Sequence, residues 1–214
     1  MNWSYILSEI IDISPLISEE IAVWPGDTPF SRIPLCSIAD GANIDLSGLK
    51  STVHLGAHAD APSHYIGSGE TIDGISLDPY IGHCIVVTVA MSKIVSKNDC
   101  LEAVKRGAKR ILFKTSSYSD PCSFNKDFGF FSPDAVAFMG EKGVTLVGID
   151  TPSVDPFDSK DLPAHAMLAK YNMRNLEGLT LEHVRDGEYE LVALPLKLRG
   201  FDASPVRAIL RKLT

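Results

Sequence analysis

The chain has 214 residues, of which 45% are hydrophobic and 22% are charged, a composition typical of a globular protein with one sizeable core. The formal net charge of −7 argues against a sequence-independent grip on nucleic acid or on an anionic membrane, because both need clustered lysine and arginine. We therefore expect a single domain over residues 1–214 that acts on a small molecule. The short basic run Arg207, Arg211 and Lys212 is expected to be a solvated helical face.

The cysteines and the N-terminus indicate a cellular compartment. None of Cys36, Cys84, Cys100 and Cys122 shows C-x-x-C spacing, so free thiols in a reducing compartment are expected. The segment Met1 to Ser14 lacks both the basic region and the small-residue cleavage site of a signal peptide. No apolar run is long enough to span a bilayer. A cytoplasmic location follows.

The N-terminal third predicts strand after strand. Tyr5 to Ile13 is rich in isoleucine and is expected to form the first strand. Residues 29–38 and 44–55 are the next expected strands. From residue 56 to residue 79 glycine, proline and polar side chains dominate and no helical period occurs, which indicates loops.

A large aromatic side chain lies in the first of these connections. Trp24-Pro25-Gly26-Asp27 combines a tight turn with an indole ring. Such a tryptophan either stacks on a flat ligand or folds back to cover the core, and the local pattern leaves both interpretations open.

The middle of the chain alternates strands and helices. The expected elements are a strand at Gly82–Met91, a helix capped by Asn98 and Asp99 and carrying Leu101, Val104 and Ala108, a strand at Ile111–Thr115, a loop at 116–131, a helix starting at Ser132-Pro133 and a buried strand at Thr145–Asp150. This order predicts an α/β core whose sheet is at least partly parallel, with right-handed crossovers. With the N-terminal strands added, we expect a mixed sheet with helices packed on part of it.

The last quarter adds two residues of chemical interest. Ser159 to Tyr171 can form a helix because Pro163 falls in its first turn, and this helix carries His165. Glu177 is expected to lie at the end of a strand. Tyr189 to Leu198 is expected to be the closing strand.

Residues 52–65 concentrate metal-binding side chains, namely His54, His58, Asp60 and His64. Imidazole nitrogen and carboxylate oxygen are the ligands of zinc, manganese and non-haem iron. In a straight strand His54 and His58 would lie roughly 13 Å apart, at about 3.3 Å per residue. Two ligands of one ion must approach within about 4 Å. The chain must therefore bend between them, and Gly56 is free to take the dihedral angles that a bend needs.

His64 stands four residues after Asp60, beyond Pro62. It can bind the metal, or it can lie beside the metal and carry protons, and the spacing alone does not decide between these roles. Other chemistries have less support, because the sequence contains no G-x-x-x-x-G-K-[ST], G-x-G-x-x-G or G-x-S-x-G motif.

The run His54-x-Gly-x-His58-x-Asp60-x-Pro62-x-His64 resembles the signature of the metal-dependent cyclase/kynurenine formamidase family, and in particular of its bacterial kynurenine formamidases (arylformamidases). The likeness covers most of the chain. Further matching segments, in the family's order, are 12–15, 23–30, 146–153, 176–178, 189–191, 193–197 and 202–207.

The resemblance implies a fold, an activity and cofactors. The implied fold is a single α/β domain of the swivelling β/β/α type that forms a homodimer. The implied reaction is the hydrolysis of N-formyl-L-kynurenine to L-kynurenine and formate in tryptophan degradation. Two Zn²⁺ ions per subunit are implied as cofactors, with Mn²⁺ as the alternative metal, and the substrate is an aryl formamide.

The resemblance also implies roles for individual residues. Metal ligands are His54, His58, Asp60, His165 and Glu177, with the Asp60 carboxylate bridging the ions; His64 is the general acid/base, and Trp24 packs on the aryl ring. Related proteins often have two adjacent histidines where this chain has His165-Ala166, so only His165 can serve there. A divalent ion acidifies water and polarises the formyl oxygen, while a neutral histidine moves the proton to the departing nitrogen.

Two alternatives remain at this point. The first is a hydrolase of the same fold that acts on a cyclic amide, lactone or imide such as isatin. The second is a non-catalytic protein that binds a metal or a small molecule for structure or sensing.

Overall fold

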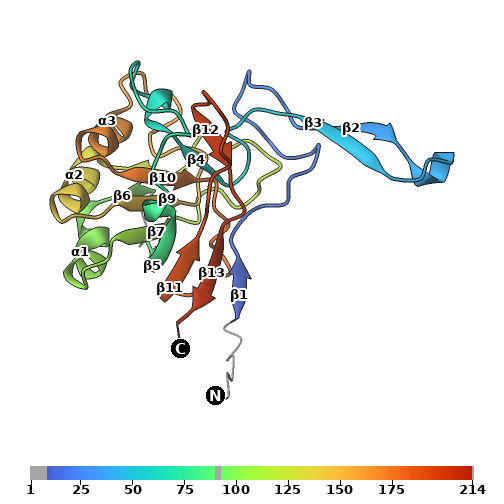
Figure 1. The fold of residues 1–214 in the computed structure, drawn as a ribbon. Helices are drawn as coiled ribbons and strands as arrows, with labels where there is room; N and C mark the ends of the chain where they lie inside the picture. The colour runs from blue at the N-terminus through green and yellow to red at the C-terminus, as the bar shows by residue number, and fades with distance from the viewer. Residues whose placement is uncertain (1–8, 90–92, 214) are drawn as a thin grey trace.

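The computed structural model describes residues 9–89 and 93–213. These residues form a mixed α/β fold around a nine-stranded sheet with both parallel and antiparallel neighbours (Figure 1). Across the sheet the strands are β1 (Ile10–Asp12), β13 (Ile209–Lys212), β11 (Gly187–Val192), β5 (Ile81–Thr88), β7 (Arg110–Lys114), β9 (Leu146–Ile149), β10 (Arg174–Glu177), β4 (His58–Asp60) and β12 (Ala203–Pro205). The predicted fold class is confirmed.

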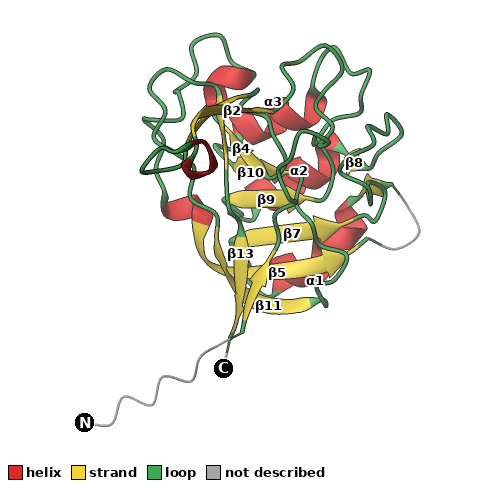
Figure 2. Ribbon diagram, turned by 90° about the vertical axis from the view of Figure 1, so that its right-hand side faces the viewer, coloured by secondary structure: helices red, strands yellow, loops and turns green. Residues whose placement is uncertain are grey.

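The centre of the sheet is parallel, because β5, β7, β9 and β10 follow one another through helical connections. The helices are α1 (Lys97–Lys105), α2 (Pro133–Glu141) and α3 (Pro163–Lys170). They lie together on one side of the parallel strands (Figures 1 and 2). The strand and helix alternation predicted for the middle of the chain is therefore confirmed.

Two apolar clusters flank the sheet, because side chains alternate along a strand. On β7, Ile111 and Phe113 pack with the helices, whereas Leu112 belongs to the opposite cluster. That opposite cluster also contains Ala59 of β4 and Leu210 of β13, which come from the two ends of the strand order. The sheet therefore curls around it, and this curl brings the two sheet ends together.

The first helix starts two residues earlier than expected. Its cap is Ser96, and Asp99 closes a capping box by accepting a hydrogen bond from the Ser96 backbone N–H at 2.8 Å. The prediction of Asn98 and Asp99 as the cap is therefore wrong, because Asp99 acts as the third helical residue of the box. The helix ends before Ala108, which packs in the core from the loop that follows.

The second helix confirms its predicted start. The Ser132 hydroxyl accepts a hydrogen bond from the backbone of the first turn, and Pro133 occupies the first helical position. The third helix begins at Pro163, four residues after the predicted Ser159, because Leu162 takes a left-handed conformation at its cap. The proline thus begins the helix and does not interrupt it.

Several strands are shorter than predicted. Two more strands form an antiparallel ribbon, β2 (Ser31–Cys36) and β3 (Leu46–Lys50), so the expected strand 44–55 ends at Lys50 and His54 lies in a loop. β11 ends at Val192, before the predicted Leu198. Part of the predicted strand Tyr5–Ile13 lies outside the described residues. β6 (Ile94–Val95) and β8 (Phe130–Phe131) form a small parallel pair.

The basic run near the C-terminus is not a helical face. Arg211 and Lys212 belong to β13, where they form ion pairs with Glu190 and Glu9. Arg207 precedes that strand and pairs with Asp12. The prediction was wrong because this segment pairs within the sheet, and its acidic partners come from β11, from β1 and from the residue before β1.

The β2–β3 ribbon projects from the body of the molecule as an arm (Figure 1). A short 3-10 helix, Ile38–Asp40, lies at its tip, and two others lie at Pro62–His64 and Asp78–Tyr80. The large apolar side chains exposed on the arm are Ile33, Leu35, Ile38, Ile44, Leu46 and Leu49.

All four cysteines are free thiols, as predicted, and Cys84 and Cys100 are buried. Across residues 9–89 and 93–213 no helix combines the length and the apolar character needed to cross a membrane.

Candidate metal centre

Strand pairing brings the first two donors together. β4 pairs antiparallel with β10, so that His58 lies opposite Glu177 in the register. Asp60, two residues beyond His58, points to the same face because strand side chains alternate. The His58 Nε2 lies 3.2 Å from Glu177 Oε2 and 3.6 Å from Asp60 Oδ1.

The predicted bend occurs at Gly56. This residue has φ +55°, and an added Cβ atom would approach Pro15 Cγ to 3.1 Å. Its carbonyl oxygen accepts a hydrogen bond from His58 Nδ1 at 2.9 Å. The bend places His54 Nδ1 3.1 Å from Asp60 Oδ1, so His54 and His58 face one carboxylate oxygen.

The third histidine arrives from α3. His165 Nε2 lies 3.4 Å from Asp60 Oδ2 and 3.6 Å from Glu177 Oε1. Its other ring nitrogen donates to Asp155 Oδ2 at 2.8 Å, and Asp155 also accepts the Ala164 N–H at 2.8 Å. One buried aspartate therefore positions both the start of the helix and the imidazole ring.

The cluster is buried in a way that protein groups alone do not satisfy. Asp60 is 0% exposed, and His58 and Glu177 are each 3% exposed. Neither His58 Nε2 nor Asp60 Oδ1 has a hydrogen-bond partner among the described residues. Buried carboxylates are costly unless they are paired or bind a metal. The unsatisfied atoms and the N/O donor set fit a divalent cation such as zinc or manganese.

The outward nitrogens of the histidines support the same interpretation. His58 donates to the carbonyl of Gly56, His165 to Asp155, and His54 Nε2 to Asp202 Oδ2 at 3.0 Å. Histidines that bind metals usually donate their second ring nitrogen to a carboxylate or a carbonyl in this way. Each of the three rings is thus held with one nitrogen directed at the carboxylates.

The charges within the cluster shift its titrations. Burial raises the pKa of Asp60, but the neighbouring His165 and His54 rings outweigh burial and hold that pKa well below its usual range. Burial lowers the pKa of His54, yet the neighbouring Asp60 and Asp202 carboxylates raise it to about 9. The pKa of His165 is likewise raised, to about 10, because Asp155 and Asp60 outweigh burial. Without a metal the cluster therefore retains protons at neutral pH.

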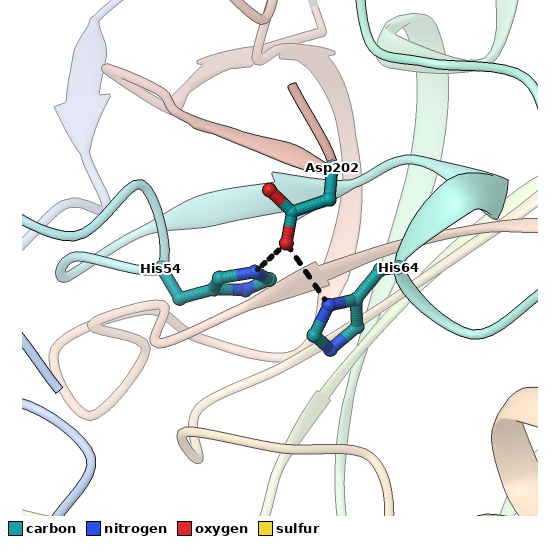
Figure 3. A group of neighbouring side chains, drawn as sticks. All are labelled: His54, His64 and Asp202. Atoms are coloured by element: carbon teal, nitrogen blue, oxygen red, sulfur yellow. Dashed lines mark hydrogen bonds and ion pairs between the residues drawn. The ribbon is translucent and has the colours of Figure 1, made fainter. Parts of the chain in front are cut away.

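His64 lies beside His54, and both rings contact Asp202 (Figure 3). The His64 side chain is 34% exposed, and its Nδ1 lies 3.3 Å from Asp202 Oδ2. One of its ring nitrogens is within 4.8 Å of an Asp60 oxygen and a His165 nitrogen. The structure therefore brings His64 to the cluster, in a place that suits either a ligand or a proton carrier.

A cavity of about 310 Å³ opens next to His54 and His58. Trp24, Tyr118 and Phe124 also line it. The indole also stacks on Phe157 at 4.9 Å and meets Phe124 edge-on at 5.4 Å. The ring therefore packs in an aromatic cluster and also lines the cavity, and its stacking on a flat ligand stays a prediction.

Three residues of this region were missed as functional from the sequence. Asn175 is fully buried, and its Nδ2 donates to Asp60 Oδ2 at 2.7 Å and to Glu177 Oε1 at 3.0 Å. Its position two residues before Glu177 in a strand was the available signal. Asp202 lies in one of the matching segments, but its role depends on side chains far away in the sequence. No local pattern marks Asp155.

A cluster of nitrogen and oxygen donors at the end of an aromatic-lined cavity, on this mixed α/β fold, defines a hydrolase with a metal-binding site. Residues 11–156 match the family model described as putative cyclase. The chain accordingly belongs to the metal-dependent cyclase/kynurenine formamidase family.

Relatives agree with this class. The chain is 38% identical over 206 residues to the kynurenine formamidases of Bacillus cytotoxicus and Bacillus anthracis, and each alignment covers 96% of this chain and 99% of the relative. A solved structure described as a potential metal-dependent hydrolase with cyclase activity has a TM-score of 0.82 and 28% identity, covering 96% of this chain and 99% of that chain. An isatin hydrolase bound to thioisatinate has a TM-score of 0.81 at 17% identity, covering 96% of this chain and 93% of that chain, a likeness that shows the fold alone. The prediction of an enzyme is confirmed, and the non-catalytic alternative is set aside.

Proposed function

We propose that this enzyme hydrolyses N-formyl-L-kynurenine to L-kynurenine and formate in tryptophan degradation. The observation that carries the proposal is the convergence of three histidines and two buried carboxylates at the end of an aromatic-lined cavity. The named relatives support the same substrate, because they are kynurenine formamidases that align over nearly the whole chain.

The proposed cofactors are two divalent cations per subunit, zinc or alternatively manganese. The proposed ligands are His54, His58, Asp60, His165 and Glu177. The two oxygens of Asp60 face different histidines: Oδ1 faces His54 and His58, whereas Oδ2 faces His165. This arrangement supports a bridging role for that carboxylate. Glu177 faces both His58 and His165, so the donors form one continuous cluster.

The proposed chemistry divides between the metal and the chain. When bound, such cations supply Lewis acidity and acidify water at neutral pH. His64 acts as general acid/base: a neutral ring accepts the proton of the attacking water and returns it to the departing aniline nitrogen. Its partly exposed place at the rim of the cluster suits both transfers, because the ring can reach the cluster and the solvent.

The substrate ring is proposed to lie against Trp24 in the cavity. The cavity volume of about 310 Å³ is within the range of small-molecule sites, which are mostly apolar with a few placed polar groups. Tyr118 and Phe124 add further aromatic surface, while His54 and His58 provide the polar end. The aryl group thereby has a wall to pack on, and the formyl group faces the cluster.

We further propose that the enzyme is a cytoplasmic homodimer. Free cysteines are consistent with a reducing compartment. A two-stranded ribbon alone is marginally stable, and the β2–β3 arm exposes apolar side chains such as Leu35 (61%) and Leu49 (70%). A second copy of the chain would cover these side chains.

The proposal is tested by elemental analysis of the purified protein together with turnover of N-formylkynurenine and isatin by the same sample. The expected result is about two equivalents of metal, activity that chelation removes and metal restores, and preference for N-formylkynurenine. Activity of a metal-free sample, or no turnover of N-formylkynurenine by the metal-replete enzyme, would contradict the proposal. Preference for isatin would favour the cyclic-imide alternative.

A further inference from the structure

We propose that Asp202 is a positioning residue that fixes the tautomer and orientation of His64 and holds His54 through the same carboxylate oxygen. The inference rests on the proposed function in one respect, because it takes His64 as the residue that moves the proton. The geometry that carries it is the contact of one carboxylate with two imidazoles (Figure 3).

The backbone around Asp202 is held by the strand that carries Asp60. The Asp202 carbonyl accepts the Ala61 N–H at 2.8 Å. The next residue, Ala203, lies opposite Asp60 in the β12–β4 register. The carboxylate therefore has a defined place relative to the cluster, although its side chain is 47% exposed.

One oxygen of Asp202 serves both rings. Oδ2 lies 3.0 Å from His54 Nε2 and 3.3 Å from His64 Nδ1. An ionised carboxylate can only accept hydrogen bonds, so each of these ring nitrogens carries its proton. In neutral His64 the lone pair is then on Nε2, which leaves that nitrogen as the base.

The same contact has a consequence for His54. When His54 is neutral, as a metal ligand must be, a proton on its Nε2 leaves the lone pair on Nδ1, and Nδ1 is the nitrogen that faces Asp60 Oδ1 at 3.1 Å. Through one oxygen atom, Asp202 thus orients His54 as a metal ligand and His64 as a base. Loss of this carboxylate should disturb the proton carrier and, more weakly, the metal.

A purely structural role for Asp202 predicts a different result. Partly exposed ion pairs contribute little to stability, about 0–1 kcal/mol, so removal of this side chain should leave the fold intact. Asp73 offers a matched control, because its carboxylate accepts the Gly200 N–H at 3.0 Å in the same loop but contacts no described imidazole. Loosening this loop without touching the histidines is therefore possible with Asp73→Ala, which removes that acceptor.

The test uses zinc-loaded, full-length protein with ¹⁵N-labelled histidine. In the wild type we expect the His64 nitrogen shifts of the Nδ1–H tautomer, and in Asp202→Ala a mixture of tautomers. Asp202→Asn should give an intermediate result, because its carbonyl oxygen still accepts hydrogen bonds. Asp73→Ala should match the wild type. This spectrum needs no substrate, so it reports on Asp202 even if the proposed reaction is wrong.

Kinetics complete the test on whichever substrate the enzyme turns over. We expect Asp202→Ala to lower kcat by about 10–100-fold, as for other partners that orient a histidine, with little change in KM. The double variant Asp202→Ala/His64→Ala should be no slower than His64→Ala, because one acts through the other. Unchanged His64 shifts in Asp202→Ala, or effects that multiply in the double variant, would overturn the proposal.

Discussion

Two regions of the molecule invert the usual pattern of burial, in opposite ways. The β4–β10 ladder buries charged side chains near one end of the strand order, where Asp60 is 0% and Glu177 is 3% exposed. The β2–β3 arm exposes apolar side chains, with Leu46 at 48% and Leu49 at 70%. A partner from outside the chain would make the residues of each region favourable.

The difference between them lies in the kind of partner. Buried carboxylates are stabilised by cations, and the surrounding histidines face the same carboxylates with one nitrogen each. Exposed apolar surface is stabilised by another apolar surface, at about 25 cal/mol per Å². The stability of the first region should therefore depend on metal concentration. The burial of the second region should depend on protein concentration.

The largest effect on the β4–β10 ladder is expected when the carboxylate that the three histidines share is removed. We expect Asp60→Asn to lose bound metal and to lower kcat by about 10³-fold or more, because this residue contacts all three histidines. Elemental analysis and steady-state kinetics measure both. The exposed Asp134→Asn is the control and should behave like the wild type. Full metal content in Asp60→Asn would remove that residue from the ligand set.

The rim of the same site should respond differently. We expect His64→Ala to lower kcat by about 10²–10⁴-fold, the usual contribution of a general acid/base, while metal content is retained. The measurement is again kinetics paired with elemental analysis. If metal is lost together with activity, His64 is a ligand and not the proton carrier.

The charge balance of the ladder predicts a pH effect on the metal-free protein. The pKa values of His54 and His165 are raised in the folded state, to about 9 and about 10. A raised pKa stabilises the fold fully below the unfolded value of about 6.5, and that stabilisation is lost as pH rises through the folded value.

Between pH 6.5 and pH 10 we therefore expect Tm of the chelated protein to fall by about 5 °C, the change that about 2 kcal/mol produces in a chain of this size. Scanning calorimetry in this pH range checks the direction. The zinc-loaded protein is the control, because metal ligands are already deprotonated and the fall should be absent. A parallel fall in both samples would show that other groups cause it.

The arm should give the smallest effect on the folded chain itself. We expect Leu35→Asp to convert dimer to monomer in analytical ultracentrifugation, while the free energy of unfolding of the monomer changes by about 0.5 kcal/mol or less. Leu77→Asp serves as the control, because Leu77 is an exposed leucine outside the arm (48%, against 61% for Leu35). A wild-type chain that is monomeric at high concentration would contradict the prediction, because no second copy of the chain would then cover the arm.

Local features of the sequence predicted the parts of this protein that depend on short spacings. The donors from His54 to His64, the bend at Gly56 and the helix start at Ser132 follow from residues within a few positions of one another. The strand and helix order likewise follows from local periodicity, so the α/β class could be predicted from the sequence. The resemblance to the family added His165 and Glu177 to the predicted metal ligands. Spacing alone does not connect these two residues to the cluster.

Only the tertiary structure decided which distant groups meet these residues. Asp155, Asn175 and Asp202 acquire their roles because α3, β10 and β12 meet around β4, and no local pattern encodes that meeting. The basic run failed as a helix for the same reason, since Arg211 and Lys212 pair with Glu190 of β11 and with Glu9, which precedes β1. The donors and their local bend thus follow from nearby residues, whereas long-range strand pairing fixes how each donor is held and which protons it can carry.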